Sequence, residues 1–132
     1  MRRTYTEKEA LMLSGLQLAY IGDSVHHLFV RSELILVPMR VHDLHTKATE
    51  QVNAVAQAKK LAQITPHLTE VEQSIVNRGR NAHPHHAAPK SAGVADYANA
   101  TGFEALLGFL YLTGQDDRID SLLHIAQEDG YA

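Results

Sequence analysis

Two stretches of the chain are apolar around most of a helical circumference, and each contains a single acidic residue. Residues 16–30 read LQLAYIGDSVHHLFV and contain Asp23, and residues 101–112 read TGFEALLGFLYL and contain Glu104. A helix of this kind has two surfaces to bury, so it lies at the centre of a domain or at a subunit interface. The two stretches therefore predict two central helices, each of which carries one carboxylate.

The rest of the chain also has helical periodicity, and no strand alternation is found. At 132 residues the chain is long enough for one domain with a real core and too short for two of ordinary size. Two capping-box patterns and the positions of Pro and Gly predict where helices begin and end. We expect a single all-α domain over residues 1–132, a bundle of five to seven helices that begins after Thr6 and continues over 16–31, 44–62, 69–79, 93–113 and 116–127.

The composition narrows the class of protein. The chain has no Cys, which removes disulfides, thiolate nucleophiles and Cys zinc sites and fits a reducing cytosol. No apolar run approaches membrane-spanning length and no secretory leader is recognisable, so we expect a cytoplasmic protein without membrane contact. A net charge of −3 argues against indiscriminate polyanion binding but leaves local basic patches open.

The two acids are costly to desolvate among Leu, Ile, Phe and Val unless a positive charge meets them. Gly22 and Gly108 lie near them in sequence, and missing side chains let two helix backbones come close enough to share a small ligand. His27, one turn after Asp23, is placed to hydrogen-bond that carboxylate or to pack at an interface. From the residues alone, a shared metal site and two unrelated carboxylates are equally supported.

A basic segment, NRGRN over residues 77–81, is joined across a His- and Pro-rich loop to Lys90. Guanidinium forks beside a Gly suit phosphate groups. The simpler interpretation is helix-end chemistry, with Arg78 complementing the helix dipole and Gly79 as a left-handed cap. A metal site with a basic loop nearby is, however, what a phosphodiesterase acting on nucleic acid requires.

These residues resemble a known family. LAYIGDSV at 18–25 resembles the signature helix of ribonuclease III catalytic domains, and FEALLGFLY at 103–111 resembles the matching downstream helix. The order of segments is most similar to the Mini-ribonuclease III group, which lacks a separate domain for binding double-stranded RNA. The resemblance covers nearly the whole chain, and further matching strings are LH at 44–45, AQA at 56–58, RGRNA at 78–82 and PK at 89–90.

The resemblance implies a ribonuclease III endonuclease-domain-like helical bundle that works as a homodimer and cleaves double-stranded RNA with Mg²⁺. Asp23 and Glu104 match the family's catalytic, metal-binding carboxylates. The implied products carry 5′-phosphate and 3′-hydroxyl ends, and the implied substrate is precursor large-subunit (23S) ribosomal RNA, with assistance by a ribosomal protein left open. Tyr20 matches the position of an aromatic residue that larger relatives insert into the partner subunit, so it and Leu16 are expected at the dimer interface.

Two further acids of full-length ribonucleases III are absent, because Ala19 and Thr101 stand in their places. The Mini group shares these absences. Mg²⁺ would then keep most of its coordination as water, which suits its reluctance to dehydrate and predicts weak binding without RNA. Without a separate RNA-binding domain, the catalytic domain itself must hold the duplex, and the residues expected to contact it are Arg78, Arg80, Asn81 and Lys90.

Other interpretations remain open at this stage. The His42–Asp43 dipeptide among nine histidines loosely resembles HD-type metal phosphohydrolases. A cluster of His83, His85 and His86 could bind zinc or copper. A non-catalytic dimeric RNA-binding scaffold on the same fold is a further alternative, although a scaffold has no use for two desolvated acids.

Overall fold

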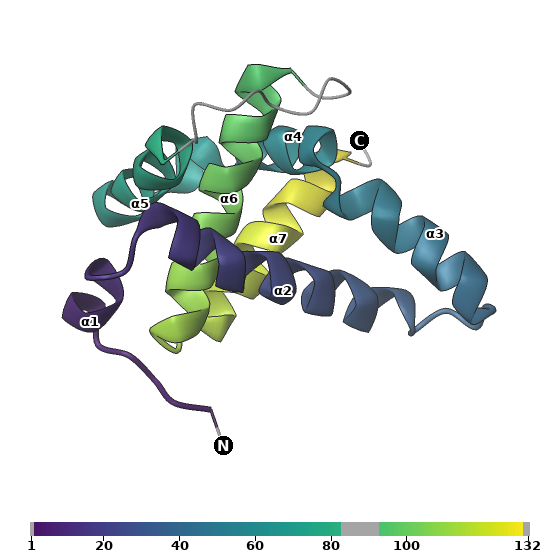
Figure 1. Ribbon diagram of the computed structural model, residues 1–132. Coiled ribbons are helices and arrows are strands. Elements are labelled where there is room, and N and C mark those ends of the chain that lie inside the picture. The colour runs from purple at the N-terminus through teal and green to yellow at the C-terminus, as the bar shows by residue number, and fades with distance from the viewer. Residues whose placement is uncertain (1, 83–92, 131–132) are drawn as a thin grey trace.

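The computed structural model describes residues 2–82 and 93–130 (Figure 1). These ranges contain helices and turns but no strand, which confirms the all-α fold class. No helix in them is long and apolar enough to cross a bilayer. The elements are α1 Glu7–Leu11, α2 Gly15–Leu34, α3 Val41–Val52, α4 Ala54–Ile64, the 3-10 turn η1 Thr65–His67, α5 Glu70–Asn81, α6 Val94–Leu112 and α7 Asp116–Gly130.

Helix α6 forms the centre of the domain. Helices α2, α4 and α5 all pack on it, and α7 lies against α4 and α6 (Figure 1). From Ala100 to Leu110 every α6 residue except Glu104 is buried. This confirms that the apolar stretch 101–112 is a central helix, since only Glu104 and Tyr111 in it are partly exposed. Its fully buried side chains interlock with those of the surrounding helices, chiefly Leu18, Ile64, Ile75, Ile119 and Leu122.

Reciprocal side-chain bonds define where three of the helices begin. The Thr6 hydroxyl accepts from the Glu9 backbone N–H at 3.1 Å, and the Glu9 carboxylate accepts from the Thr6 N–H at 2.9 Å. The same arrangement at Thr69 starts α5, so both predicted capping boxes are confirmed. A third, between Ser14 and Gln17, starts α2 and uses Gln in place of Glu.

The helix predicted over 44–62 is two helices, which corrects that prediction. Asn53 separates α3 from α4 with an extended backbone at ψ 164°. Its side-chain Oδ1 accepts from the Ala56 N–H at 2.9 Å, and its Nδ2 donates to the Thr49 and Glu50 carbonyls at 3.1 and 3.2 Å. One Asn therefore terminates one helix and caps the next, by the local bonding through which Asn competes with helix continuation.

Gly79 does not end α5, contrary to the prediction of a left-handed cap there. The helix continues to Asn81, and Gly79 is buried within it. A side chain at Gly79 would come within 2.8 Å of both the Gly102 Cα and the Ala105 Cβ of α6. The Gly is thus needed for close packing of two helices and not for a turn.

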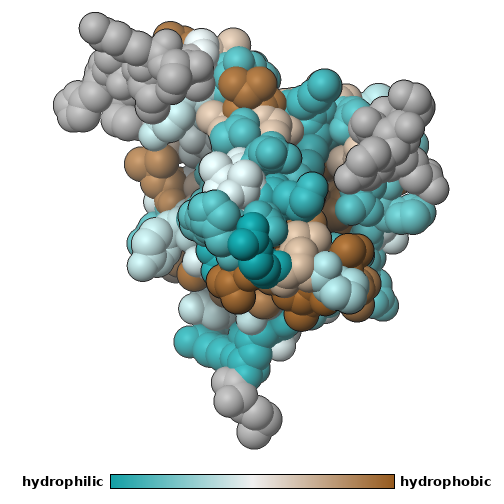
Figure 2. Space-filling view, turned by 90° about the vertical axis from the view of Figure 1, so that its right-hand side faces the viewer, coloured by the Kyte–Doolittle hydropathy of each residue, from teal (hydrophilic) through white to brown (hydrophobic). Residues whose placement is uncertain are grey.

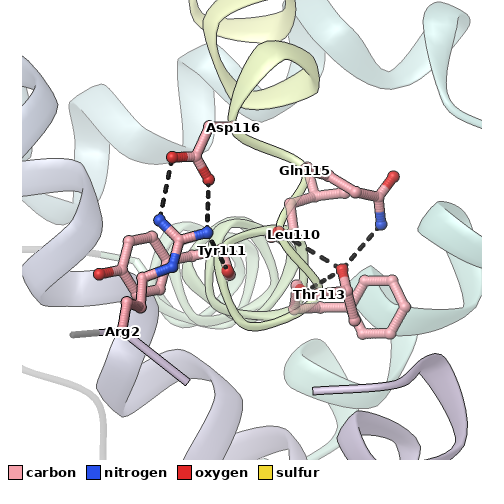
Figure 3. A network of polar contacts seen from close by, with 7 residues as sticks. Arg2, Leu110, Tyr111, Thr113, Gln115 and Asp116 are labelled. Carbon is pink, nitrogen blue, oxygen red and sulfur yellow. Dashed lines mark hydrogen bonds and ion pairs between the residues drawn. The ribbon is translucent and has the colours of Figure 1, made fainter. Parts of the chain in front are cut away.

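Gly114 ends α6 with a φ of 74°, as the sequence predicted. The Gln115 N–H donates to the Leu110 carbonyl at 2.8 Å, and the Gly114 N–H donates to the Tyr111 carbonyl at 3.1 Å. Figure 3 shows how Arg2 fastens the N-terminal segment to this end. Its guanidinium donates to both Asp116 oxygens, at 2.8 and 2.9 Å, and to the Tyr111 carbonyl at 3.1 Å.

Helices α2 and α6 cross in backbone contact. A Cβ added at Gly22 would overlap the Glu104 carbonyl oxygen, and one added at Gly108 would overlap the Leu18 carbonyl oxygen. No side chain fits at either position, which confirms the expectation that these glycines permit a close approach. The crossing therefore holds the two acid-bearing helices in direct backbone contact.

Gly22→Ala is expected to destabilise the fold by at least about 3 kcal/mol or to prevent folding, because both backbones would have to move apart. Thermal unfolding followed by circular dichroism measures the effect. Gly93→Ala is the matched control, since the nearest atom to its added Cβ is Asp96 Oδ2 at 3.9 Å. Equal melting temperatures for the two variants would contradict the crossing described here.

Candidate metal centre

Asp23 and Glu104 meet at the glycine crossing. Asp23 follows Gly22 in α2, and Glu104 lies one turn before Gly108 in α6, so the close approach of the backbones brings the two carboxyl groups together. They are near enough to share a hydrogen bond. Asp23 is the more open of the two, with 57% of its side chain exposed, whereas Glu104 is partly covered. One face of the pair is therefore accessible to a ligand from solvent.

The electrostatics of the pair favour a cation. The pKa of Glu104 is raised to about 8, first by burial and then by the hydrogen bond and the negative charge of Asp23. A hydrogen bond from Gln57 acts in the opposite direction. Without a counter-ion, Glu104 holds a proton at neutral pH, which removes the repulsion between two negatively charged carboxylates. A divalent cation between the carboxylates would remove the same repulsion. The carboxylate oxygens therefore fit a hard, oxygen-preferring ion such as Mg²⁺.

His27 extends the site along α2. Its Nε2 lies 3.4 Å from Asp23 Oδ1, one helical turn away. The two side chains are thus in contact, and a hydrogen bond between them or a role of His27 at an interface stays a prediction. The contact orients the more exposed carboxylate, which has few other constraints.

The positions of the two absent acids hold no ligand. Ala19 is buried, and the Thr101 hydroxyl donates to the Tyr97 carbonyl of its own helix at 3.0 Å. Within residues 2–82 and 93–130, no group of three or more His, Asp or Glu side chains is arranged to hold a metal. A cation at this centre would thus have Asp23 and Glu104 as its protein ligands, with water or substrate oxygens completing its coordination.

The HD-type alternative is not supported by the geometry. His42 is exposed, and Asp43 contacts Arg40 at 3.4 Å. The histidines of the proposed zinc or copper cluster and Lys90 lie outside the described residues.

Three polar residues beside Glu104 are missing from the sequence predictions. Gln57 Nε2 lies 3.4 Å from Glu104 Oε2 and 3.1 Å from His26 Nδ1, and Lys60 Nζ lies 3.1 Å from His26 Nε2. Gln57 and Lys60 are three residues apart on one face of α4, and His26 is four residues after Gly22 on the α6-facing side of α2. That spacing was the available signal, but it becomes informative only once α2, α4 and α6 are known to converge.

The basic segment divides into two parts. The Arg78 guanidinium is half-buried and donates to the Leu13 carbonyl at 2.7 Å, so it joins α5 to the start of α2. Arg80 and Asn81 are exposed in the last turn of α5. The aliphatic part of Arg80 packs on Gly102, which leaves its charged end toward solvent.

Exposed apolar side chains lie beside Asp23 on α2. Tyr20 is 79% exposed and Leu16 is 48% exposed, one and two turns before the carboxylate. Met12, in the preceding connection, is 80% exposed. Large apolar residues in this number on one exposed side indicate an interaction surface.

A second exposed apolar group lies at the far end of α2 and the start of α3. Figure 2 shows hydrophobic side chains in the lower part of the face that contains this end. Its members are Ile35, Leu36, Val37 and Val41, which are 58–80% exposed.

Comparison with known proteins identifies the family. The model of the Ribonuclease III domain family matches residues 16–115, a range that includes both acid-bearing helices. The chain therefore belongs to the ribonuclease III family and is an endoribonuclease of that type.

Relatives place it more narrowly. A "Mini-ribonuclease 3" of Symbiobacterium thermophilum is 50% identical over 119 residues, covering 89% of this chain and 91% of the relative. One of Desulfitobacterium hafniense is 49% identical over 108 residues, covering 81% of this chain and 68% of the relative. A crystal structure of a protein from Fusobacterium nucleatum has a TM-score of 0.80 and 28% identity, covering 89% of this chain and 93% of that one. The resemblance to the Mini-ribonuclease III group is confirmed.

Glu104→Gln is expected to stabilise the metal-free protein. A carboxyl whose pKa is about 8 in the folded state and near 4.5 when unfolded lowers stability as pH rises between these values. The gain should be absent near pH 4.5 and reach on the order of 2 kcal/mol at pH 8. Urea unfolding at a series of pH values, with the exposed Glu50→Gln as control, measures it. A gain that shrinks as pH rises would contradict the site.

Proposed function

We propose that the protein cleaves double-stranded RNA in a Mg²⁺-dependent reaction in which Asp23 and Glu104 hold the metal. The observation that carries this proposal is the meeting of these two carboxyl groups at the glycine crossing, in a chain of the ribonuclease III family. The raised pKa of Glu104 supports it, because it indicates a site with a deficit of positive charge.

Glu104 and Asp23 would have different roles, because one is partly buried and the other is exposed. Glu104, partly buried and bonded to Gln57, is the more rigid ligand. Asp23, exposed and in contact with His27, faces the solvent from which a substrate phosphate would arrive. When bound, Mg²⁺ supplies an activated water and stabilises the negative charge that develops on phosphorus during in-line displacement. The RNA phosphate would complete the set of oxygen ligands that two carboxylates leave unfilled.

Product ends and substrate follow from the family resemblance. We propose products with 5′-phosphate and 3′-hydroxyl ends, and the ends of precursor large-subunit (23S) ribosomal RNA as the natural substrate, in the cytoplasm. The relatives are Mini-ribonucleases 3, which supports a Mini-ribonuclease III activity. Assistance by a ribosomal protein is compatible with this role and is not needed for the chemistry.

Duplex RNA would be held through its phosphates and minor groove by the end of α5 and the segment that follows it. Arg80 and Asn81 are the exposed candidates, and Lys90 is retained from the sequence prediction. Arg78 would contribute mainly by fixing α5 against α2, because its guanidinium is already bonded to Leu13.

A homodimer is proposed to form through the exposed apolar side of α2. Tyr20 and Leu16 would be covered by the partner, which accounts for their exposure in the single chain. Since they lie one and two turns from Asp23, each metal centre would border the interface. Two centres in one dimer could then cut both strands of a duplex.

Asp23→Asn tests the catalytic assignment. It is expected to reduce cleavage of long double-stranded RNA by about 100-fold or more, because loss of a metal ligand removes several kcal/mol of transition-state stabilisation. Cleavage is measured on gels with and without Mg²⁺, beside the exposed Asp117→Asn as charge-matched control.

Normal cutting by Asp23→Asn would disprove the mechanism whatever the fold. Inertness of the wild-type protein with every tested duplex would instead favour the RNA-binding scaffold.

Arg80→Ala tests the RNA contact. We expect weaker duplex binding and a salt dependence of log K that is lower by about one unit, as loss of one phosphate contact requires. Binding of the catalytically inactive Asp23→Asn protein, with and without the Arg80 change, is measured by fluorescence anisotropy over a range of salt concentrations. Arg40→Ala on α3 serves as control. An unchanged salt dependence of log K would show that Arg80 does not contact an RNA phosphate.

A further inference from the structure

A largely buried chain of polar groups connects Glu104 to a cleft lined by residues of α2, α4 and α7. It runs from Glu104 Oε2 to Gln57 Nε2 at 3.4 Å, to His26 Nδ1 at 3.1 Å, and from His26 Nε2 to Lys60 Nζ at 3.1 Å. Gln57 is 3% exposed and His26 is fully buried, with its ring edge-to-face on Phe103 at 5.1 Å. The outer end is open, because His26 and Lys60 line a cleft of about 460 Å³.

His26 faces two neighbours that can both donate hydrogen bonds, but it cannot accept from both of them. Burial lowers its pKa to about 3, so the ring is neutral and has one N–H and one lone pair. An amide nitrogen and a lysine ammonium can only donate. If Gln57 and Lys60 both donated, His26 would need two lone pairs, which a neutral imidazole lacks. At least one of its two neighbours must therefore accept.

Two arrangements satisfy the ring. In the first, the Gln57 NH₂ group donates to both Glu104 and His26 Nδ1, and the His26 Nε2–H donates to an uncharged Lys60 amine. In the second, a Lys60 ammonium donates to Nε2, the Nδ1–H donates to the Gln57 oxygen, and the amide is turned over. The second arrangement points a carbonyl oxygen at Glu104 in place of a donor.

An ionised Glu104 selects the first arrangement, since a carboxylate repels the amide oxygen and accepts from the amide nitrogen. An uncharged Lys60 is accessible because burial lowers its pKa to about 8. The state of Lys60 and the direction of the Gln57 amide are thus linked through one imidazole ring.

We propose that Gln57 is a positioning residue for Glu104, and that His26 and Lys60 determine which face of its amide the carboxylate meets. This inference rests on the proposed role of Glu104 as a metal ligand. With its NH₂ group toward Oε2, Gln57 holds one carboxylate oxygen and leaves the other for a cation shared with Asp23. Groups of this kind that orient metal ligands typically change metal affinity by about 10- to 100-fold when removed.

Two substitutions of Lys60 should affect Mg²⁺ binding differently. Arginine keeps the charge but can only donate, so Lys60→Arg should force the Nδ1–H form of His26 and turn the Gln57 amide away. Glutamine can accept through its carbonyl, so Lys60→Gln should preserve the first arrangement although the charge is lost. Mg²⁺ affinity is therefore expected to fall by about 10-fold in the first variant and to change little in the second.

The test is nuclear magnetic resonance of the ¹⁵N-labelled full chain, titrated with Mg²⁺ alone. Amide shifts around Asp23 and Glu104 give the affinity, and the ring ¹⁵N shifts of His26, assigned by comparison with His26→Phe, give its tautomer. For the Mg²⁺-loaded wild type we expect a protonated Nε2 and a bare Nδ1. Gln57→Met should bind Mg²⁺ about 10-fold or more weakly while remaining folded.

A protonated Nδ1 in the Mg²⁺-loaded wild type would overturn the proposal, and this measurement needs no variant to fold. Equal Mg²⁺ affinity in wild type and Gln57→Met, or in Lys60→Arg and Lys60→Gln, would also overturn it while leaving the metal centre intact. Absence of any Mg²⁺ response near the two carboxylates in the wild type would instead remove the metal centre itself, and the positioning role with it.

Discussion

The backbone contact between α2 and α6 is the constraint on which the rest of the structure depends. Because Gly22 and Gly108 have no side chains, two helices that are apolar on nearly every face can cross without an intervening layer. The crossing places Asp23 and Glu104 side by side, and it leaves α4, α5 and α7 to cover the remaining surface of α6. With ordinary side chains at the two glycine positions, the helices would lie further apart. The two carboxyl groups would then be too far from each other to share a cation.

The same contact explains why the site is electrostatically incomplete. It brings one carboxyl into the protein interior beside a second acid, and the only partner that α4 supplies among the described residues is the neutral Gln57. Lys60, whose pKa burial lowers to about 8, lies one residue further away, beyond His26. No Lys or Arg among the described residues therefore contacts either acid, as a site that must accept an external cation requires.

Much of the fold and of the candidate site could be predicted from the sequence. Where the predictions were wrong or incomplete, the reason is physical. Apolar periodicity located α2 and α6, and the capping boxes located α1 and α5. Two acids in apolar surroundings, together with the family resemblance, indicated the candidate centre. The break at Asn53 was missed because an Asn can bond to its own backbone anywhere in a helical pattern. Gly79 was misread as a cap because packing against Gly102 leaves no local signature. Gln57, His26 and Lys60 belong to two helices, and their relation exists only in three dimensions.

The central claim is that the glycine crossing creates one cation site shared by Asp23 and Glu104. The most direct measurement is a crystal structure of the protein soaked in Mn²⁺, which substitutes for Mg²⁺ and can be located by its anomalous scattering. We expect a single strong peak at the α2–α6 crossing, in contact with an oxygen of each carboxylate and otherwise surrounded by water. A peak that contacts only one of the two carboxylates, or strong Mn²⁺ sites elsewhere with none at the crossing, would contradict it.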